Sequence, residues 1–138
     1  MSDRIKVVVL GTGQMGSGMI KLLLHKHGLE LAGVYGRRAC RVGLDVGKAI
    51  GLEHAIGVTI TNDLEGLLRR TKPHVVIQAT CSRVGQAVDE ITTALNQGAN
   101  VISIAEEMAY PAYQSPSLAA AMHRLAVANQ VTVVGTGN

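Results

Sequence analysis

A glycine turn joins an apolar strand to a helical segment near the start of this chain and limits the folds that the chain can adopt. Val7 to Leu10 form an apolar run without polar alternation, which is typical of a parallel strand covered by helices on both faces. Gly11, Gly13 and Gly16 follow in a G-x-G-x-x-G pattern, and a helix-patterned segment comes next. In such a turn the first glycine permits a tight bend and the second lets a diphosphate approach the backbone. The third lets the helix pack closely on the strand.

This turn predicts a site for the pyrophosphate of a dinucleotide, with a plain strand–turn–helix connection as the alternative. The chain holds 16 glycines, so the pattern alone is weak, and its flanking strand and helix favour the dinucleotide interpretation. A helix N-terminus adds free N–H groups and a partial positive charge, both of which suit a diphosphate. The residues expected around the pyrophosphate are Gly11, Thr12, Gly13, Gln14, Met15 and Gly16.

Strand and helix patterns alternate along the whole chain. Strands are predicted at residues 5–10, 29–35, 58–60, 74–79, 100–104 and 131–134. Helices are predicted at 14–27, 45–50 and 64–70, then from residue 84 toward Gly98, and from a Ser115 cap onward. This alternation requires right-handed crossovers. The sequence therefore predicts an α/β fold with a doubly wound, mostly parallel six-stranded sheet, the Rossmann fold, as one domain over residues 1–138.

The apolar spacing on three helices predicts which side chains face the core. On the first helix these are Met15, Met19, Leu22 and Leu23. On the helix after residue 84 they are Val84, Val88, Ile91 and Leu95. On the last helix they are Leu118, Ala121, Met122, Leu125 and Ala128.

The end of the second predicted strand bears on the choice of dinucleotide. An acidic residue at this place commonly holds the ribose 2′-hydroxyl of NAD, but here the chain reads Gly36, Arg37, Arg38. Two guanidinium groups without a carboxylate suit a 2′-phosphate, so NADP is predicted, with NAD as a possible cofactor. Contacts of about 1.5–3 kcal/mol each would favour NADPH by roughly ten- to several hundredfold. The alternative is that both arginines belong to a solvated loop.

Two further strand ends are predicted to border the nicotinamide side of the same crevice. Ala79, Thr80, Cys81 and Ser82 close the fourth strand, and Ala105 and Glu106 follow the fifth. Neighbouring residues point in different directions, so we expect only one of Glu106 and Glu107 to face the site. Glu106 is the candidate for the nicotinamide ribose or a substrate amine, with a helix-start cap as the alternative. Cys81 has no histidine nearby in sequence, which argues against a nucleophile.

Composition narrows the classes of partner. The chain has three Tyr and no Phe or Trp, which removes the stacking platforms of single-stranded nucleic-acid binders. A net charge of +3 suits solubility and one anionic ligand rather than a nucleic acid. Cys40 and Cys81 are far apart, as expected of free thiols in a reducing cytoplasm and not of a metal site. The first apolar run ends at Gly11, too early for a signal peptide or a membrane span.

The residues also carry a family resemblance. The stretch from Gly11 to Met19 resembles the cofactor domain of the dihydrodipicolinate-reductase-like superfamily. Within that superfamily, the 2,4-diaminopentanoate dehydrogenases are similar to this chain at two further stretches. These are residues 101–111, which include Ile104-Ala105-Glu106-Glu107-Met108, and the closing residues 133–138. The resemblance runs the length of the chain, and the stretch around Glu106 is far more specific than the glycine pattern.

The resemblance implies an NAD(P)-dependent oxidative deamination of 2,4-diaminopentanoate, in the ornithine degradation route. Hydride passes from the amine-bearing carbon to the nicotinamide, and the imine is then hydrolysed to 2-amino-4-oxopentanoate. Members of that family continue into a substrate-binding and dimerising domain, so we expect a homodimeric full-length enzyme and an inactive fragment. Gly36 stands where some relatives carry an acid, so the choice of cofactor rests on Arg37 and Arg38.

The alternatives to this function are a dihydrodipicolinate reductase of lysine biosynthesis, a non-catalytic dinucleotide sensor, and a regulatory domain with an empty crevice. No catalytic acid or base stands out.

Overall fold

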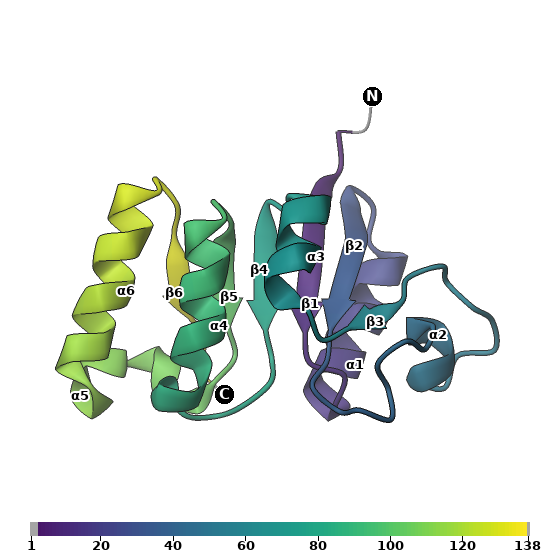
Figure 1. Ribbon diagram of the computed structural model, residues 1–138, viewed down its shortest axis with the longest axis horizontal. Coiled ribbons are helices and arrows are strands. Elements are labelled where there is room, and N and C mark those ends of the chain that lie inside the picture. The colour runs from purple at the N-terminus through teal and green to yellow at the C-terminus, as the bar shows by residue number, and fades with distance from the viewer. Residues whose placement is uncertain (1–2, 138) are drawn as a thin grey trace.

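The computed structural model describes residues 3–137, so Asn138 at the end of the resemblance lies outside the described residues (Figure 1). Its strands are β1 (Ile5–Leu10), β2 (Leu29–Tyr35), β3 (Ile60–Thr61), β4 (Val75–Gln78), β5 (Asn100–Ser103) and β6 (Val133–Gly135). Its helices are α1 (Gln14–His25), α2 (Val46–Ala49), α3 (Leu64–Thr71), α4 (Val84–Asn96), α5 (Pro111–Gln114) and α6 (Pro116–Ala128), with the 3-10 turn η1 (Glu106–Ala109).

All six strands form one parallel sheet in the order β3-β2-β1-β4-β5-β6. This order confirms the doubly wound fold predicted from the alternation of elements. The chain moves outward from β1 to β3, returns through α3 to β4 beside β1, and then moves outward again. The reversal between β1 and β4 leaves a crevice at the carboxyl ends of these strands, the place where doubly wound sheets bind ligands.

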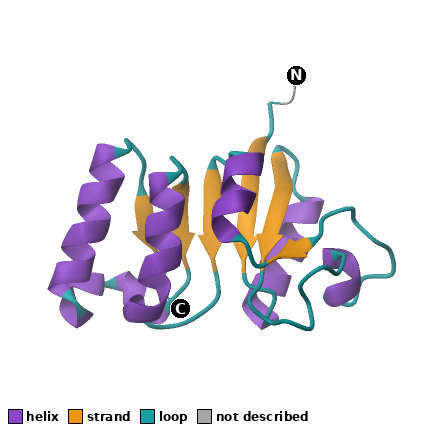
Figure 2. Ribbon diagram, in the orientation of Figure 1, coloured by secondary structure: helices purple, strands orange, loops and turns teal. Residues whose placement is uncertain are grey.

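Helices cover the two faces of the sheet unequally. Helices α3, α4 and α6 lie in front of the sheet in the view of Figure 2, and α1 lies behind β1 and β2. The front layer buries a core that includes Val8, Val76, Ile91 and Leu95, all 0% exposed. The rear layer buries a smaller core around Val9, Ile20 and Val34. Residues Val7 to Leu10 supply side chains to both cores, which explains their unbroken apolar run.

Local interactions set most of the element ends. Asp63 accepts a hydrogen bond from the Gly66 amide at the start of α3, and Ser115 accepts one from Leu118 at the start of α6, as side chains at N-caps do. The predicted first helix runs two residues too far, because Lys26 is already extended. The third strand begins later than predicted because Thr59 instead bridges antiparallel to Asp45. The sixth begins at Val133, since the Val131 amide still bonds to Ala126 at the end of α6.

Some predicted core positions are wrong, because the helices are rotated relative to the predicted apolar faces. Met15 and Leu22 are half exposed, and Ile20 is the fully buried residue of α1. The sheet-facing side of α1 consists of Gly16, Ile20 and Leu23. On α6, Ala128 is exposed and Ala126 is buried beside Met122.

The described residues contain no helix long and apolar enough to cross a membrane. Cys40 is exposed and Cys81 is half-buried, and both are free thiols, as predicted.

Asp45 holds the loop between β2 and β3 in shape. Its carboxylate accepts the backbone N–H groups of Gly47 at 2.8 Å, Ile56 at 3.0 Å and Gly57 at 2.9 Å. The hydrogen bond from Ile56 and then those from Gly57 and Gly47 hold the pKa of this carboxyl below its usual value. Asp45 therefore ties α2 to residues 56–57 and supports the loop that carries the arginines of the crevice.

We predict that Asp45→Asn lowers the thermal midpoint at neutral pH. The folded pKa of Asp45 lies below the unfolded one, so its stabilisation is complete above the unfolded pKa of about 3.9. It is lost as the pH falls through the folded value. Thermal unfolding followed by circular dichroism from pH 7 to about pH 2.5 should therefore show the two proteins converging in acid. A difference in midpoint that is independent of pH would contradict this role.

Candidate dinucleotide-binding crevice

The glycine turn joins β1 to α1 at the carboxyl edge of the sheet. Gly11 has φ +113°, and a Cβ there would lie 2.5 Å from the carbonyl oxygen of Ala79 at the end of β4. A Cβ on Gly16 would overlap the carbonyl oxygen of Gly11. These two glycines therefore serve the fold: one permits a left-handed backbone, and the other lets α1 press against the turn.

Gly13 differs from both of these glycines. It has φ −73° and ψ −162°, a conformation open to any residue, and a Cβ would meet only Arg38 Nη2, at 4.0 Å. Nothing in the fold therefore requires a glycine here. Gly13 is the N-cap of α1, and no side chain caps this helix. An uncapped twelve-residue helix beginning in open space beside a bare backbone has the features of a phosphate cradle.

Two adjoining hollows extend from this turn along the carboxyl edge of the sheet. The first, of about 130 Å³, is lined by Gly11, Thr12, Gly13, Gly36, Arg37, Arg38, Ala79 and Thr80. The second, of about 270 Å³, is lined by Gly13, Gln14, Met15, Ala79, Thr80, Cys81, Ser82, Ile104 and Glu106. They share Gly13, Ala79 and Thr80, so the helix start lies between a basic end and an end that contains Glu106. A larger hollow of about 430 Å³ lies at the opposite edge, around Lys72 and His74.

The structure brings together all but two of the residues predicted for the site. Gly16 lies buried beneath the turn. Ala105 is 1% exposed and lines neither hollow, and its N–H group donates to the Ser103 hydroxyl at 3.2 Å.

The two adjacent glutamates after β5 have separate roles. Glu107 accepts a hydrogen bond from the Val84 amide at 3.0 Å and so caps α4, while its own N–H donates to the Ser82 carbonyl. Glu106 lines the second hollow. Only Glu106 of the pair therefore lines the crevice, as expected. The other role considered for Glu106, a cap at the start of a helix, is performed by Glu107.

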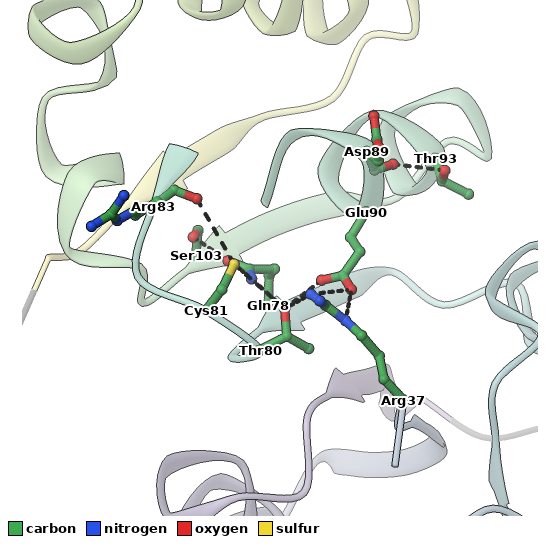
Figure 3. Close-up of polar contacts among 9 residues, drawn as sticks. All are labelled: Arg37, Gln78, Thr80, Cys81, Arg83, Asp89, Glu90, Thr93 and Ser103. Atoms are coloured by element: carbon green, nitrogen blue, oxygen red, sulfur yellow. Dashed lines mark hydrogen bonds and ion pairs between the residues drawn. The ribbon is translucent and has the colours of Figure 1, made fainter. Parts of the chain in front are cut away.

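The arginines of the β2 end also differ from one another. Arg38 lines the first hollow, beside Gly13. Arg37 turns across the crevice to Glu90 on α4, donating from Nε at 2.9 Å, with Nη2 2.8 Å from the same carboxylate oxygen (Figure 3). Arg41, which the sequence did not single out, donates to the Thr12 carbonyl at 2.6 Å and ties its loop to the glycine turn.

A chain of hydrogen bonds continues from Glu90 through Thr80, which lines the crevice, to the buried Gln78 and Ser103 (Figure 3). Glu90 accepts from the Thr80 hydroxyl at 2.5 Å, and Gln78 Nε2 donates to Thr80 at 2.8 Å. The Ser103 hydroxyl donates to Gln78 Oε1 at 2.5 Å. Gln78 and Ser103 are fully buried, so the bonds connect the ends of β4 and β5 beneath the solvent surface.

Burial and the charge of Glu90 shift the pKa values of Tyr35 and Arg37. Burial raises the pKa of Tyr35, the Glu90 carboxylate raises it further, and Arg37 opposes both. Burial acts to lower the pKa of Arg37, but the attraction of Glu90 and its hydrogen bond outweigh burial and raise it. Arg37 therefore remains a cation, paired with a buried anion.

Sequence reasoning missed Glu90 because it stands among the apolar positions of α4 without a local motif. Ala87, Ile91 and Ala94 on the same face are all 0% exposed. A carboxylate on a core-facing helical stripe is itself a signal, since it must find a cation or hydrogen-bond donors there. Arg41 gave no comparable signal.

A doubly wound parallel sheet with a glycine turn and an open helix N-terminus at its switch point defines the class of Rossmann-type domains. Residues 5–104 match the dihydrodipicolinate reductase N-terminal family, and the chain belongs to that family.

Similar proteins agree with this assignment. The chain is 37% identical to a 2,4-diaminopentanoate dehydrogenase of Acetoanaerobium sticklandii, over 98% of this chain and 38% of the relative. It is 34% identical to a 4-hydroxy-tetrahydrodipicolinate reductase of Moorella thermoacetica, over 74% of this chain and 37% of the relative. It superposes on an amine dehydrogenase of Mycobacterium smegmatis with a TM-score of 0.91 and 34% identity, covering 96% of this chain and 39% of that structure. The chain thus spans about two fifths of the length of these proteins.

Gly16 and Gly13 of the turn should respond differently to alanine. Gly16→Ala is expected to destabilise the fold by about 1–3 kcal/mol, because its methyl group has no space. Gly13→Ala should leave the thermal midpoint close to the original and weaken binding of NADPH at least tenfold, or about 1.4 kcal/mol. Fluorescence titration and thermal unfolding of each variant measure both effects.

Gly18→Ala is the matched control within α1, since a Cβ there meets nothing within 4 Å. It should retain binding and gain up to about 1 kcal/mol of stability. Unchanged binding in Gly13→Ala would contradict a backbone cradle at Gly13.

Proposed function

We propose that this chain is the cofactor-binding part of an NAD(P)-dependent dehydrogenase that acts on a CH–NH₂ group, with 2,4-diaminopentanoate as substrate. The observation that carries this proposal is the open backbone at Gly13, at the start of an uncapped helix between the two hollows. The similarity to a 2,4-diaminopentanoate dehydrogenase over 98% of the chain supports the substrate class.

The residues of the two hollows suit the two ends of such a cofactor. The backbone from Gly11 to Gly16 would hold the pyrophosphate, and Ala79 to Ser82 would border the nicotinamide side. When bound, the oxidised nicotinamide would supply the hydride acceptor for the amine-bearing carbon. Hydrolysis of the resulting imine would release ammonia and the amino-oxo acid. Glu106 would hold the substrate ammonium by a charge-assisted hydrogen bond beside that carbon.

NADP is the proposed cofactor, because the first hollow contains Arg38 and lacks an acid at Gly36. A Cβ on Gly36 would lie 3.1 Å from a methyl group of Ile60, so the backbone fits tightly beneath the hollow. The full-length protein is proposed to be a homodimer. A 4-hydroxy-tetrahydrodipicolinate reductase is the second candidate, supported by the family match and by the Moorella thermoacetica relative.

Fluorescence titration with NADPH and NADH tests the cofactor proposal. Arg38→Ala is expected to weaken NADPH by about tenfold, the effect of one charge-assisted contact, and to change NADH little. The preference should also fall as salt rises. Arg124→Ala, an exposed arginine on α6, is the control and should change neither. Equal affinity for both nucleotides in the unaltered protein would refute the NADP proposal.

The role of Glu106 predicts a separation of binding from turnover. In the natural full-length protein, Glu106→Gln should reduce kcat/KM for 2,4-diaminopentanoate by at least about tenfold, because a charged contact worth about 1.5–3 kcal/mol is lost. Affinity for NADPH should stay within about twofold. Absorbance of the reduced cofactor reports the rate. Turnover of the cyclic imine substrate of the reductases, and not of the diamine, would favour the second candidate.

A further inference from the structure

Glu90 is a charged side chain where the core of α4 needs none. Its side chain is 8% exposed, and its neighbours on the same helical face are fully buried alanine and isoleucine. Burying a carboxylate costs several kcal/mol unless cations and donors surround it. The role of Glu90 therefore lies in the contact of its carboxylate with the guanidinium of Arg37, on the far side of the crevice.

The hydrogen bonds fix how Arg37 is presented. A carboxylate only accepts, so the Thr80 hydroxyl must donate to Glu90, and its lone pairs then accept from Arg37 and Gln78. Nε and Nη2 of Arg37 are engaged by Glu90 and Thr80. Tyr35 also forms a side-chain hydrogen bond with Arg37, and Arg37 lines the first hollow.

The pairing weakens what Arg37 offers to an anion. A phosphate in the first hollow meets a guanidinium that is already paired with the Glu90 carboxylate, so the opposed charges partly cancel at the ligand. Arg38 lines the same hollow, and the salt bridges of the described residues do not involve it. Of the two arginines at the end of β2, Arg38 therefore presents the uncompensated charge.

We propose that Glu90 is a specificity-determining residue that limits the preference for a 2′-phosphorylated dinucleotide by neutralising Arg37. Arg38 then supplies most of the recognition of the 2′-phosphate, and NADH remains a usable ligand. Glu90 acts through Arg37 and is a positioning residue rather than a ligand itself. The inference rests on the proposed function, since it assumes that a dinucleotide lies in the crevice.

Glu90→Gln tests the inference directly, because glutamine keeps the shape and removes the charge. Affinity for NADPH should rise about tenfold, as Arg37 gains its full charge toward the phosphate, and affinity for NADH should stay within about twofold. The dependence of NADPH binding on salt should become steeper. The ratio of the two affinities is the readout, since a purely structural role would change both nucleotides alike.

Two comparisons isolate the pair. Asp89→Asn removes the same charge from the neighbouring exposed position of α4 and should leave the ratio unchanged. In an Arg37→Gln background, Glu90→Gln should no longer raise NADPH affinity, because the cation that it releases is absent. Glu90→Met, which leaves no polar group in the core, should reproduce the gain if the glutamine variant folds poorly.

The outcomes separate this inference from the proposed function. An unchanged or lower ratio in a folded Glu90→Gln or Glu90→Met protein overturns the role of Glu90 while leaving dinucleotide binding in place. A gain that persists without Arg37 also overturns it. Failure of the unaltered protein to bind either nucleotide overturns both proposals.

Discussion

Close packing of α1 against the backbone of the glycine turn determines where the crevice forms. The absence of a Cβ at Gly16 lets the helix lie directly on the Gly11 carbonyl, and the left-handed Gly11 lets the chain turn beneath Ala79. The helix N-terminus is thereby brought over the carboxyl edge of the sheet, beside the reversal between β1 and β4. Larger side chains at these positions would lift α1 away, and the open backbone at Gly13 would no longer face the crevice.

The two ends of the crevice carry side chains of opposite charge. One end has arginines from the loop after β2, and the other has Glu106 from the turn after β5. Between these ends, hydrogen bonds run from the buried Ser103 and Gln78 through Thr80 to Glu90. Among residues 3–137, every buried side-chain nitrogen or oxygen has a hydrogen-bond partner, so this network links the strand ends without leaving an unsatisfied side-chain atom in the core. The network also links a core-facing charge on α4 to an arginine at the opposite side of the site.

The sequence predicts most of the fold, because strand composition and helix periodicity are local properties that survive in the tertiary structure. The doubly wound parallel sheet followed from the alternation of elements, and β1 and β2 were located to the residue. The crevice residues were largely found from strand ends, since parallel strands end at one edge. What failed depended on distant contacts: the rotation of α1 that buries Ile20 in place of Leu22, the pairing of Arg37 with Glu90, and the approach of Arg41 to Thr12. A residue 53 positions away cannot be assigned to Arg37 from local pattern.

Dinucleotide binding at the start of α1 can be tested by following backbone amide resonances by NMR while NADPH is added. The largest shifts should fall on Gly13, Gln14 and Met15, whose N–H groups begin α1, with further shifts at Thr80 and Glu106. Shifts confined to the hollow around Lys72 and His74 at the opposite edge, or none at saturating nucleotide, would contradict it.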